Sequence, residues 1–229
     1  MASPPADSKS DTTPPTTISL RAPSKYLSSS TKSEPATTAQ SPFISPPLDW
    51  LCRTWSVTHS TLSMWQSKRN VRITYKPLEP SSSSSSSAPK IDDLVESEKN
   101  NGKGGISRIE GIDTPDPSSP GSWDWRGKGW LKIASSHWEV LGWGERPLMR
   151  GLGDMGEGVE RWVVTWFAAT LFTKEGVDIY CDRREGPSPE TVEMIMRELK
   201  ALDAAPTVVQ LVEREMRDVE IKLPWKEKN

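Results

Sequence analysis

Residues 159–203 read VERWVVTWFAATLFTKEGVDIYCDRREGPSPETVEMIMRELKALD, and this stretch decides the fold. Its pattern predicts a strand, a tight turn, a second strand, an arginine and a helix. In the second strand, residues 177–183, apolar and polar side chains alternate, so that Ile179 and Cys181 share one face with Arg183. A period of two is typical of a half-buried antiparallel strand.

The end of this stretch predicts an amphipathic helix over residues 188–202. Ser188 can cap the free N–H groups, Pro189 suits the first helical position, and Pro206 ends the helix. A second amphipathic helix is predicted over residues 208–219, where the apolar stripe either packs on the domain or covers a partner. The stripe of the first helix recurs in steps of three and four: Val192, Ile195, Leu199 and Leu202.

Composition divides the chain of 229 residues into a tail and one domain. Residues 1–46 are rich in Ser, Thr and Pro and carry few large apolar side chains, so we expect a disordered tail. Residues 47–225 form the foldable domain. Within it, a serine run predicts a flexible insertion at 79–90, and Gly and Pro residues predict a mobile loop at 144–158.

The formal net charge of −2 comes from interspersed acids and bases, so nucleic acid is not an expected partner. No apolar segment is long enough to span a bilayer. The N-terminus lacks the pattern of a secretory signal, and we expect a cytoplasmic protein with reduced thiols. The two cysteines, Cys52 and Cys181, have no metal-ligand spacing, and neither a metal nor a cofactor is expected.

Further segments with alternating polarity or residues typical of β-strands precede residue 159 in the domain. Joined in sequence by turns, these strands predict a mainly-β fold: an eight-stranded antiparallel up-and-down β-barrel, or calyx, with a C-terminal helix packed on the outside. The additional strands are expected at residues 49–61, 70–78, 91–98, 105–112, 129–135 and 138–143.

Alternation within these strands predicts the side chains that face the barrel interior. The sequence also holds eleven tryptophans against three tyrosines and three phenylalanines. Flat rings of this size suit the wall of a ligand cavity, and they equally suit a well-filled core, so both interpretations stay open. The expected inward residues are Trp55, Val57, His59, Val71, Ile73, Tyr75, Leu131, Ile133, Trp138, Val140, Ile179 and Cys181.

This arrangement resembles the lipocalin family of the calycin superfamily. The residues Arg53-Thr54-Trp55 stand where the family has Gly-x-Trp at the first strand, with Arg53 in place of the glycine, and Arg183 matches the arginine at the end of the last barrel strand. Residues 185–199 resemble the strand-to-helix segment of the branch that contains bacterial lipocalins and apolipoprotein D. The tryptophan-rich middle of the chain resembles fungal lipocalin-like proteins.

The resemblance implies that Arg183 packs over Trp55 and closes the barrel. An arginine over an indole contributes roughly 0.5–2 kcal/mol. The alternative is that Arg183 only forms an ion pair with nearby acids.

The resemblance also implies a calyx that binds a small hydrophobic, lipid-like molecule. His59 is then a candidate to bond a polar group of the ligand, or a haem, although such a histidine can simply be satisfied by a neighbour. Two other functions stay open: a filled barrel that contacts a protein partner through its tail and loops, and a small enzyme with a Cys181 nucleophile. We expect no enzyme, and the oligomeric state is not predicted. The candidate ligand-binding residues are Val57, His59, Ile73, Tyr75, Ile133, Trp138, Val140, Ile179 and Cys181.

Overall fold

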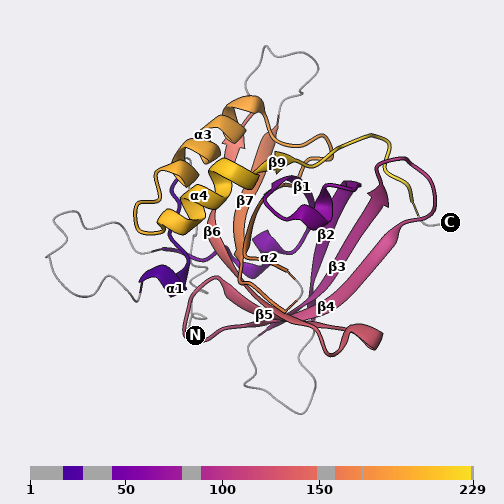
Figure 1. The fold of residues 1–229 in the computed structure, drawn as a ribbon, viewed down its shortest axis with the longest axis horizontal. Coiled ribbons are helices and arrows are strands. Elements are labelled where there is room, and N and C mark those ends of the chain that lie inside the picture. Colours follow the sequence, from indigo (N-terminus) through magenta and orange to yellow (C-terminus); the bar gives the residue numbers. More distant parts are fainter. Residues whose placement is uncertain (1–17, 28–42, 79–88, 149–157, 172, 228–229) are drawn as a thin grey trace, which may run out of the picture.

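The computed structural model describes residues 18–27, 43–78, 89–148, 158–171 and 173–227. These residues form a closed antiparallel barrel in which each strand pairs with the next and β8 pairs back with β1 (Figure 1). The predicted eight-stranded up-and-down barrel is therefore confirmed. Its strands are β1 Thr54–Ser60, β2 Lys68–Leu78, β3 Lys90–Lys99, β4 Ser107–Pro115, β5 Ser122–Gly127, β6 Ser135–Pro147, β7 Val159–Phe167 and β8 Gly176–Cys181.

The two predicted C-terminal helices pack on the outside of the barrel wall, side by side (Figure 1). Ser188 caps the first of them as expected, because its side chain accepts a hydrogen bond from the Thr191 N–H. After the second helix, the chain adds a two-residue strand that pairs with the end of β1, beyond the residues that pair with β2. These elements are α3 Pro189–Lys200, α4 Pro206–Glu215 and β9 Arg217–Asp218, and the short helices are α1 Ser24–Leu27, α2 Leu48–Leu51, η1 Ser63–Trp65 and η2 Gly129–Leu131.

The fifth strand lies earlier in the chain than predicted. The predicted strand over residues 129–135 is wrong, since the chain there forms the short helix η2 and a turn, and Ile133 is 86% exposed. Gly129 has a φ of 58°, which a strand does not accommodate. The strand is instead formed by β5, whose sequence SWDWRG itself alternates between tryptophan and charged residues.

In β8, the side chains that point into the barrel are the ones that were predicted to point outward. All six residues of β8 are buried, because the barrel interior covers one face and the C-terminal helices cover the other. Tyr180 belongs to the interior cluster, whereas Ile179 packs outward in one cluster with Ile195 of α3. Cys181 lies directly opposite Trp162, which is also on the helix-covered face. The prediction that Ile179 and Cys181 face the interior is therefore wrong.

The first strand carries a bulge that turns His59 outward. The pairing of β1 with β8 shifts between Val57 and His59, and one extra residue in a strand reverses the faces of the residues that follow. After the shift it is Ser60 that reaches inward, where its hydroxyl donates to Asp178. His59 pairs with Asp218 of β9, with 3.2 Å between Nε2 and Oδ1. The predicted inward position of His59 is wrong for this reason.

A segment within the N-terminal tail, residues 18–27, packs on the outside of β6. Ile18 and Ala22 are buried there, and the Arg21 N–H donates to the Leu141 carbonyl at 2.8 Å. A side chain at Gly142 would come within 2.7 Å of a tail carbonyl, so glycine permits this close approach. Residues 1–17 and 28–42 of the tail, and most of the predicted insertion at 79–90 and loop at 144–158, lie outside the described residues.

Glu160 on β7 connects the barrel to the start of α3. Its buried carboxylate accepts hydrogen bonds from the Ser188 N–H at 2.7 Å, from the Ser188 hydroxyl at 2.6 Å and from the Thr191 hydroxyl. These donors lie at the first turn of the helix, where a negative charge also complements the helix dipole.

We expect Glu160→Ala to lower the free energy of unfolding by about 1–3 kcal/mol, because the substitution leaves buried donors without an acceptor. The measurement is urea denaturation followed by circular dichroism. Glu193→Ala is the control, since Glu193 is exposed on α3, the helix whose first turn Glu160 contacts, and its effect should stay within about 0.5 kcal/mol. Equal losses in the two variants would contradict this role for Glu160.

Candidate ligand cavity

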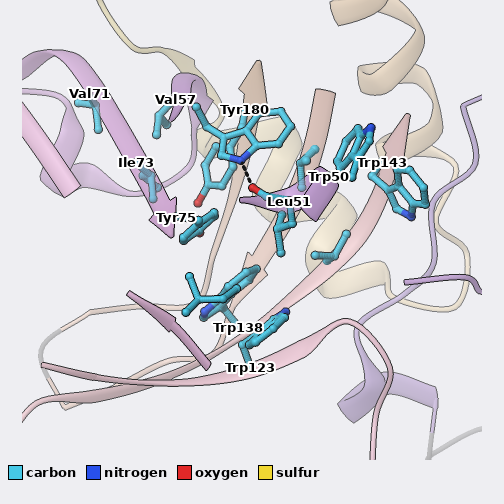
Figure 2. Packing of buried hydrophobic residues seen from close by; sticks show 14 of the residues in the cluster. Trp50, Leu51, Val57, Val71, Ile73, Tyr75, Trp123, Trp138, Trp143 and Tyr180 are labelled. Atoms are coloured by element: carbon cyan, nitrogen blue, oxygen red, sulfur yellow. Dashed lines mark hydrogen bonds between the residues drawn. The ribbon is translucent and has the colours of Figure 1, made fainter. Parts of the chain in front are cut away.

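One end of the barrel is filled by tryptophan side chains around α2. The Trp50 ring lies 5.4 Å from the Trp55 ring and 4.6 Å from the Trp143 ring, measured between centroids. The Trp55 indole N–H donates to the Leu51 carbonyl at 2.9 Å, which fastens β1 to this plug (Figure 2). This end of the barrel is closed, and we refer to Trp50, Leu51, Trp55 and Trp143 as the plug.

The guanidinium of Arg53 lies over two rings of the plug, 5.2 Å from the Trp50 centroid and 5.4 Å from the Trp55 centroid. Arg183 pairs with Glu185, and its backbone carbonyl accepts a hydrogen bond from the Ser56 hydroxyl at 2.8 Å. The chain after β8 is thus held to β1. A direct contact between Arg183 and Trp55 stays a prediction.

The other end of the barrel is hollow. A cavity of about 540 Å³ lies between the β1–β2, β5–β6 and β7–β8 loops and extends into the barrel. Sites for small organic molecules are typically about 300–1,000 Å³ in volume. Aromatic and aliphatic side chains make up most of the lining, which includes Leu62, Met64, Trp65, Ile73, Tyr75, Val95, Ile109, Trp125, Leu131, Ile133, Trp138, Phe167 and Tyr180.

Three stacked rings cross the interior next to this cavity. Tyr75 and Trp138 are nearly parallel, with an interplanar angle of 4° and centroids 5.7 Å apart. Trp123 continues the stack on Trp138 at 5.9 Å, and Figure 2 shows these two rings apart from Trp50 and Trp143. Flat, rigid rings in this arrangement offer a large apolar contact surface to a planar or elongated ligand.

Two carboxyl groups interrupt the apolar interior toward the closed end. Asp93 on β3 lines the cavity and is opposite Tyr75, while Asp113 on β4 accepts a hydrogen bond from the Trp138 indole N–H at 2.8 Å. Burial raises the pKa of Asp93 well above its ordinary value, and the neighbouring Asp113 raises it further. Burial likewise raises the pKa of Asp113, against the effect of the Trp138 hydrogen bond.

A third acid, Asp178 on β8, lines the cavity nearer to its mouth. The Ser60 hydroxyl donates to one carboxylate oxygen, and the Trp65 indole N–H lies 3.4 Å from the other. Burial raises the pKa of Asp178 to about 7, although these two hydrogen bonds act to lower it. Asp178 therefore has partners within the protein for both of its oxygens.

The structure brings some of the predicted ligand-binding residues together and separates others. Ile73, Tyr75, Trp138 and Ile133 line the cavity, the last from the β5–β6 loop and not from a strand. Val57 and Val140 belong to the interior hydrophobic cluster. Their contacts with a ligand stay predictions. On the outer side of the wall lie His59, Ile179 and Cys181, as described above.

The cavity acids were not among the predicted site residues. A signal for one of them does exist, because Ile91, Asp93 and Val95 alternate along one face of a strand that the sequence predicts. A carboxyl group on an apolar strand face is unusual, since an unpaired buried acid is costly. No comparable signal marks Asp113, whose strand is weakly patterned.

Comparison with known proteins finds no family model that matches the sequence, and no curated protein matches it. Among solved structures, H1 crustacyanin from the lobster Homarus americanus is similar at 9% identity and a TM-score of 0.47, covering 90% of each chain. Apocrustacyanin C1 has 9% identity and a TM-score of 0.45 over 75% of this chain and 77% of its own. The siderocalin Ex-FABP has 8% identity and a TM-score of 0.40, over 78% of this chain and 95% of its own.

The barrel assignment rests on the strand pairing described above and not on these distant similarities. Among the described residues, no helix is long and apolar enough to cross a membrane. The same residues contain no group of three or more His, Cys, Asp or Glu side chains placed to hold a metal ion.

The raised pKa of Asp113 predicts a pH-dependent cost to the fold. A carboxyl whose pKa is higher in the folded state than in the unfolded chain favours folding below the unfolded pKa, near 3.9, and this contribution is lost as the pH rises through the folded pKa. Asp113→Asn keeps an oxygen for the Trp138 N–H and cannot ionise. We expect the stability of the variant relative to the native chain to rise progressively between about pH 4 and pH 8, by about 1–3 kcal/mol in total.

Urea denaturation at a series of pH values measures this difference. Glu110→Gln is the matched control, because Glu110 is an exposed acid on the same strand, and its difference from the native chain should not change with pH. Parallel curves for the native chain and Asp113→Asn would contradict a raised pKa at Asp113.

Proposed function

We propose that this protein binds a small, mostly apolar molecule in the cavity at the open end of its barrel. The observation that supports this most is the uneven filling of the interior: tryptophans pack the closed end, while the opposite half contains a cavity of about 540 Å³ lined by aromatic and aliphatic side chains. Burial of apolar ligand surface contributes roughly 25 cal/mol per Å². We further propose that the chain is a lipocalin-like protein of the branch that contains bacterial lipocalins and apolipoprotein D, and that it acts in the cytoplasm.

The two alternative functions are less well supported by these features. A barrel filled solely for structural purposes does not account for the cavity. An enzyme with a Cys181 nucleophile needs a base and a lowered thiol pKa. Burial instead raises the pKa of Cys181, and both ring nitrogens of His59 lie near other groups, Thr58 and Asp218.

The proposal predicts that occluding the cavity abolishes binding. Val95 lines the cavity, and the adjacent Leu94 lies on the other face of β3. We expect Val95→Trp to weaken the binding of all-trans retinol, a neutral apolar probe, at least about tenfold. Leu94→Trp is the matched control and should bind retinol like the native chain.

Retinol fluorescence is the readout, because it does not depend on the number of tryptophans. Fatty alcohols of increasing length serve as a second probe series, with an expected optimum at the length that fills the cavity. Absence of saturable binding across both series, or equal binding by Val95→Trp and the native chain, would contradict the proposed function.

A further inference from the structure

The carboxyl groups of Asp93 and Asp113 form a polar site within the otherwise apolar cavity region. The two residues lie on adjacent strands and on the same face of the sheet, because Asp93 pairs with Gly111 and Asp113 pairs with Ile91 in one continuous register. Both are buried, with exposed fractions of 6% and 0%. Their positions in β3 and β4 place them deeper in the barrel than the loops that surround the cavity.

Each of these acids has an oxygen without a hydrogen-bond partner among the described residues: Oδ1 of Asp93 and Oδ2 of Asp113. The ion pairs of the described residues include neither acid. Lys128, which acts electrostatically on Asp93, is paired with Asp92 on the outer face of β3. Unpaired buried carboxyl groups are costly, and they are usually explained by a ligand, a bound ion or a function.

The surroundings of the acids favour a cation. Tyr75 is directly opposite Asp93, the Trp138 ring stacks on Tyr75, and the Trp125 indole lies over Gly111, the pairing partner of Asp93. A side chain on Gly111 would come within 2.0 Å of the Trp125 Nε1, so glycine makes room for this ring. Aromatic faces attract cations, and they do so more strongly where water is excluded.

We propose that Asp93 and Asp113 bind the ammonium group of an amphipathic amine, whose apolar body occupies the remainder of the cavity. An ammonium carries three donors, enough to satisfy the two unpaired oxygens, and its charge compensates a carboxylate in a region of low dielectric constant. A carboxylate ligand carries no donor for these two oxygens, and its negative charge would further oppose ionisation of the acids. This inference rests on the proposed function, because it names the class of ligand for the same cavity.

Binding of an amine is coupled to loss of a proton from the acids. In the empty cavity, burial and mutual repulsion favour the protonated form of Asp93, and an ammonium favours the ionised form. The groups that face this site are Tyr75 from β2, Trp125 from β5, Trp138 from β6 and Tyr180 from β8, with Asp178 and Lys128 as the more distant charges. Amine affinity should therefore rise with pH while the amine itself stays protonated.

The experiment compares three probes with one aromatic body: naphthylethylamine, naphthylethanol and naphthylacetic acid. We expect the amine to bind at least about tenfold more tightly than the alcohol at about pH 8, and the acid more weakly than the alcohol. Isothermal titration calorimetry in two buffers of different ionisation enthalpy should detect proton release with the amine and none with the alcohol.

Two variants test whether Asp93 causes the preference for the amine. Asp93→Asn should reduce amine affinity to that of the alcohol and abolish proton release, while alcohol binding is retained, which shows that the variant is folded. Asp92→Asn is the matched control, since Asp92 is the adjacent acid on the outer face of β3, and it should leave the preference for the amine unchanged.

The outcomes separate this inference from the function on which it rests. If the alcohol and retinol bind and the amine has no advantage, the amine site is wrong and the apolar cavity stands. If the amine is preferred equally by Asp93→Asn and the native chain, the acids are not its site and the inference fails. If none of the probes binds, both proposals are overturned.

Discussion

The packing of Trp55 against Trp50 at one end of the barrel is the interaction on which the rest of the structure depends. This packing joins β1 to the preceding helix α2. The Trp55 ring is fully buried, and its indole N–H donates a hydrogen bond to the Leu51 carbonyl of α2. The Trp55 N–H has this partner, so the position of the ring is fixed by a hydrogen bond as well as by contact. The rings of the plug fill this end, and the cavity lies at the opposite end, between three loops, where Trp65, Trp125 and Trp138 line it.

The outer side of the wall imposes a second constraint. The helices α3 and α4 and residues 18–27 cover β6, β7 and β8, so these strands are buried on both faces. The sequence predicted the helix stripe and the half-exposed strands well, because in those elements polarity reports directly on exposure. For β8 the inward and outward faces were predicted in reverse. Asp178 and Tyr180 have the polarity of a solvent-exposed face, although they line the cavity. The polarity of a side chain indicates whether it is exposed to water, but it does not indicate which of two buried faces of a strand it lies on.

Other features were hidden from the sequence for local reasons. The bulge near Val57 reverses the face on which His59 lies, and no residue type in the strand predicts this bulge. The strand β5 lies between Gly- and Pro-rich segments that are typical of loops. Residues 18–27 lie within a tail whose overall composition is that of an unfolded segment, and their packing is permitted by Gly142, far away in the sequence. Of the candidate site, the apolar wall at Ile73, Tyr75 and Trp138 was predicted; Asp93 was missed although its strand pattern carries a signal, and Asp113 has no such signal.

The acids and the apolar wall are parts of one arrangement and not separate features. The Trp138 ring stacks on Tyr75, and its indole N–H donates to Asp113, so the same side chain sets the aromatic surface and orients a carboxyl group. Cavity volume alone discriminates poorly, because an apolar pocket accepts many molecules of suitable size. A buried polar group discriminates more strongly, since a ligand that cannot satisfy it leaves an unpaired atom in the complex. Under the proposed function, the aromatic rings of this barrel limit the size of the ligand, and the two acids select the functional group that the ligand carries.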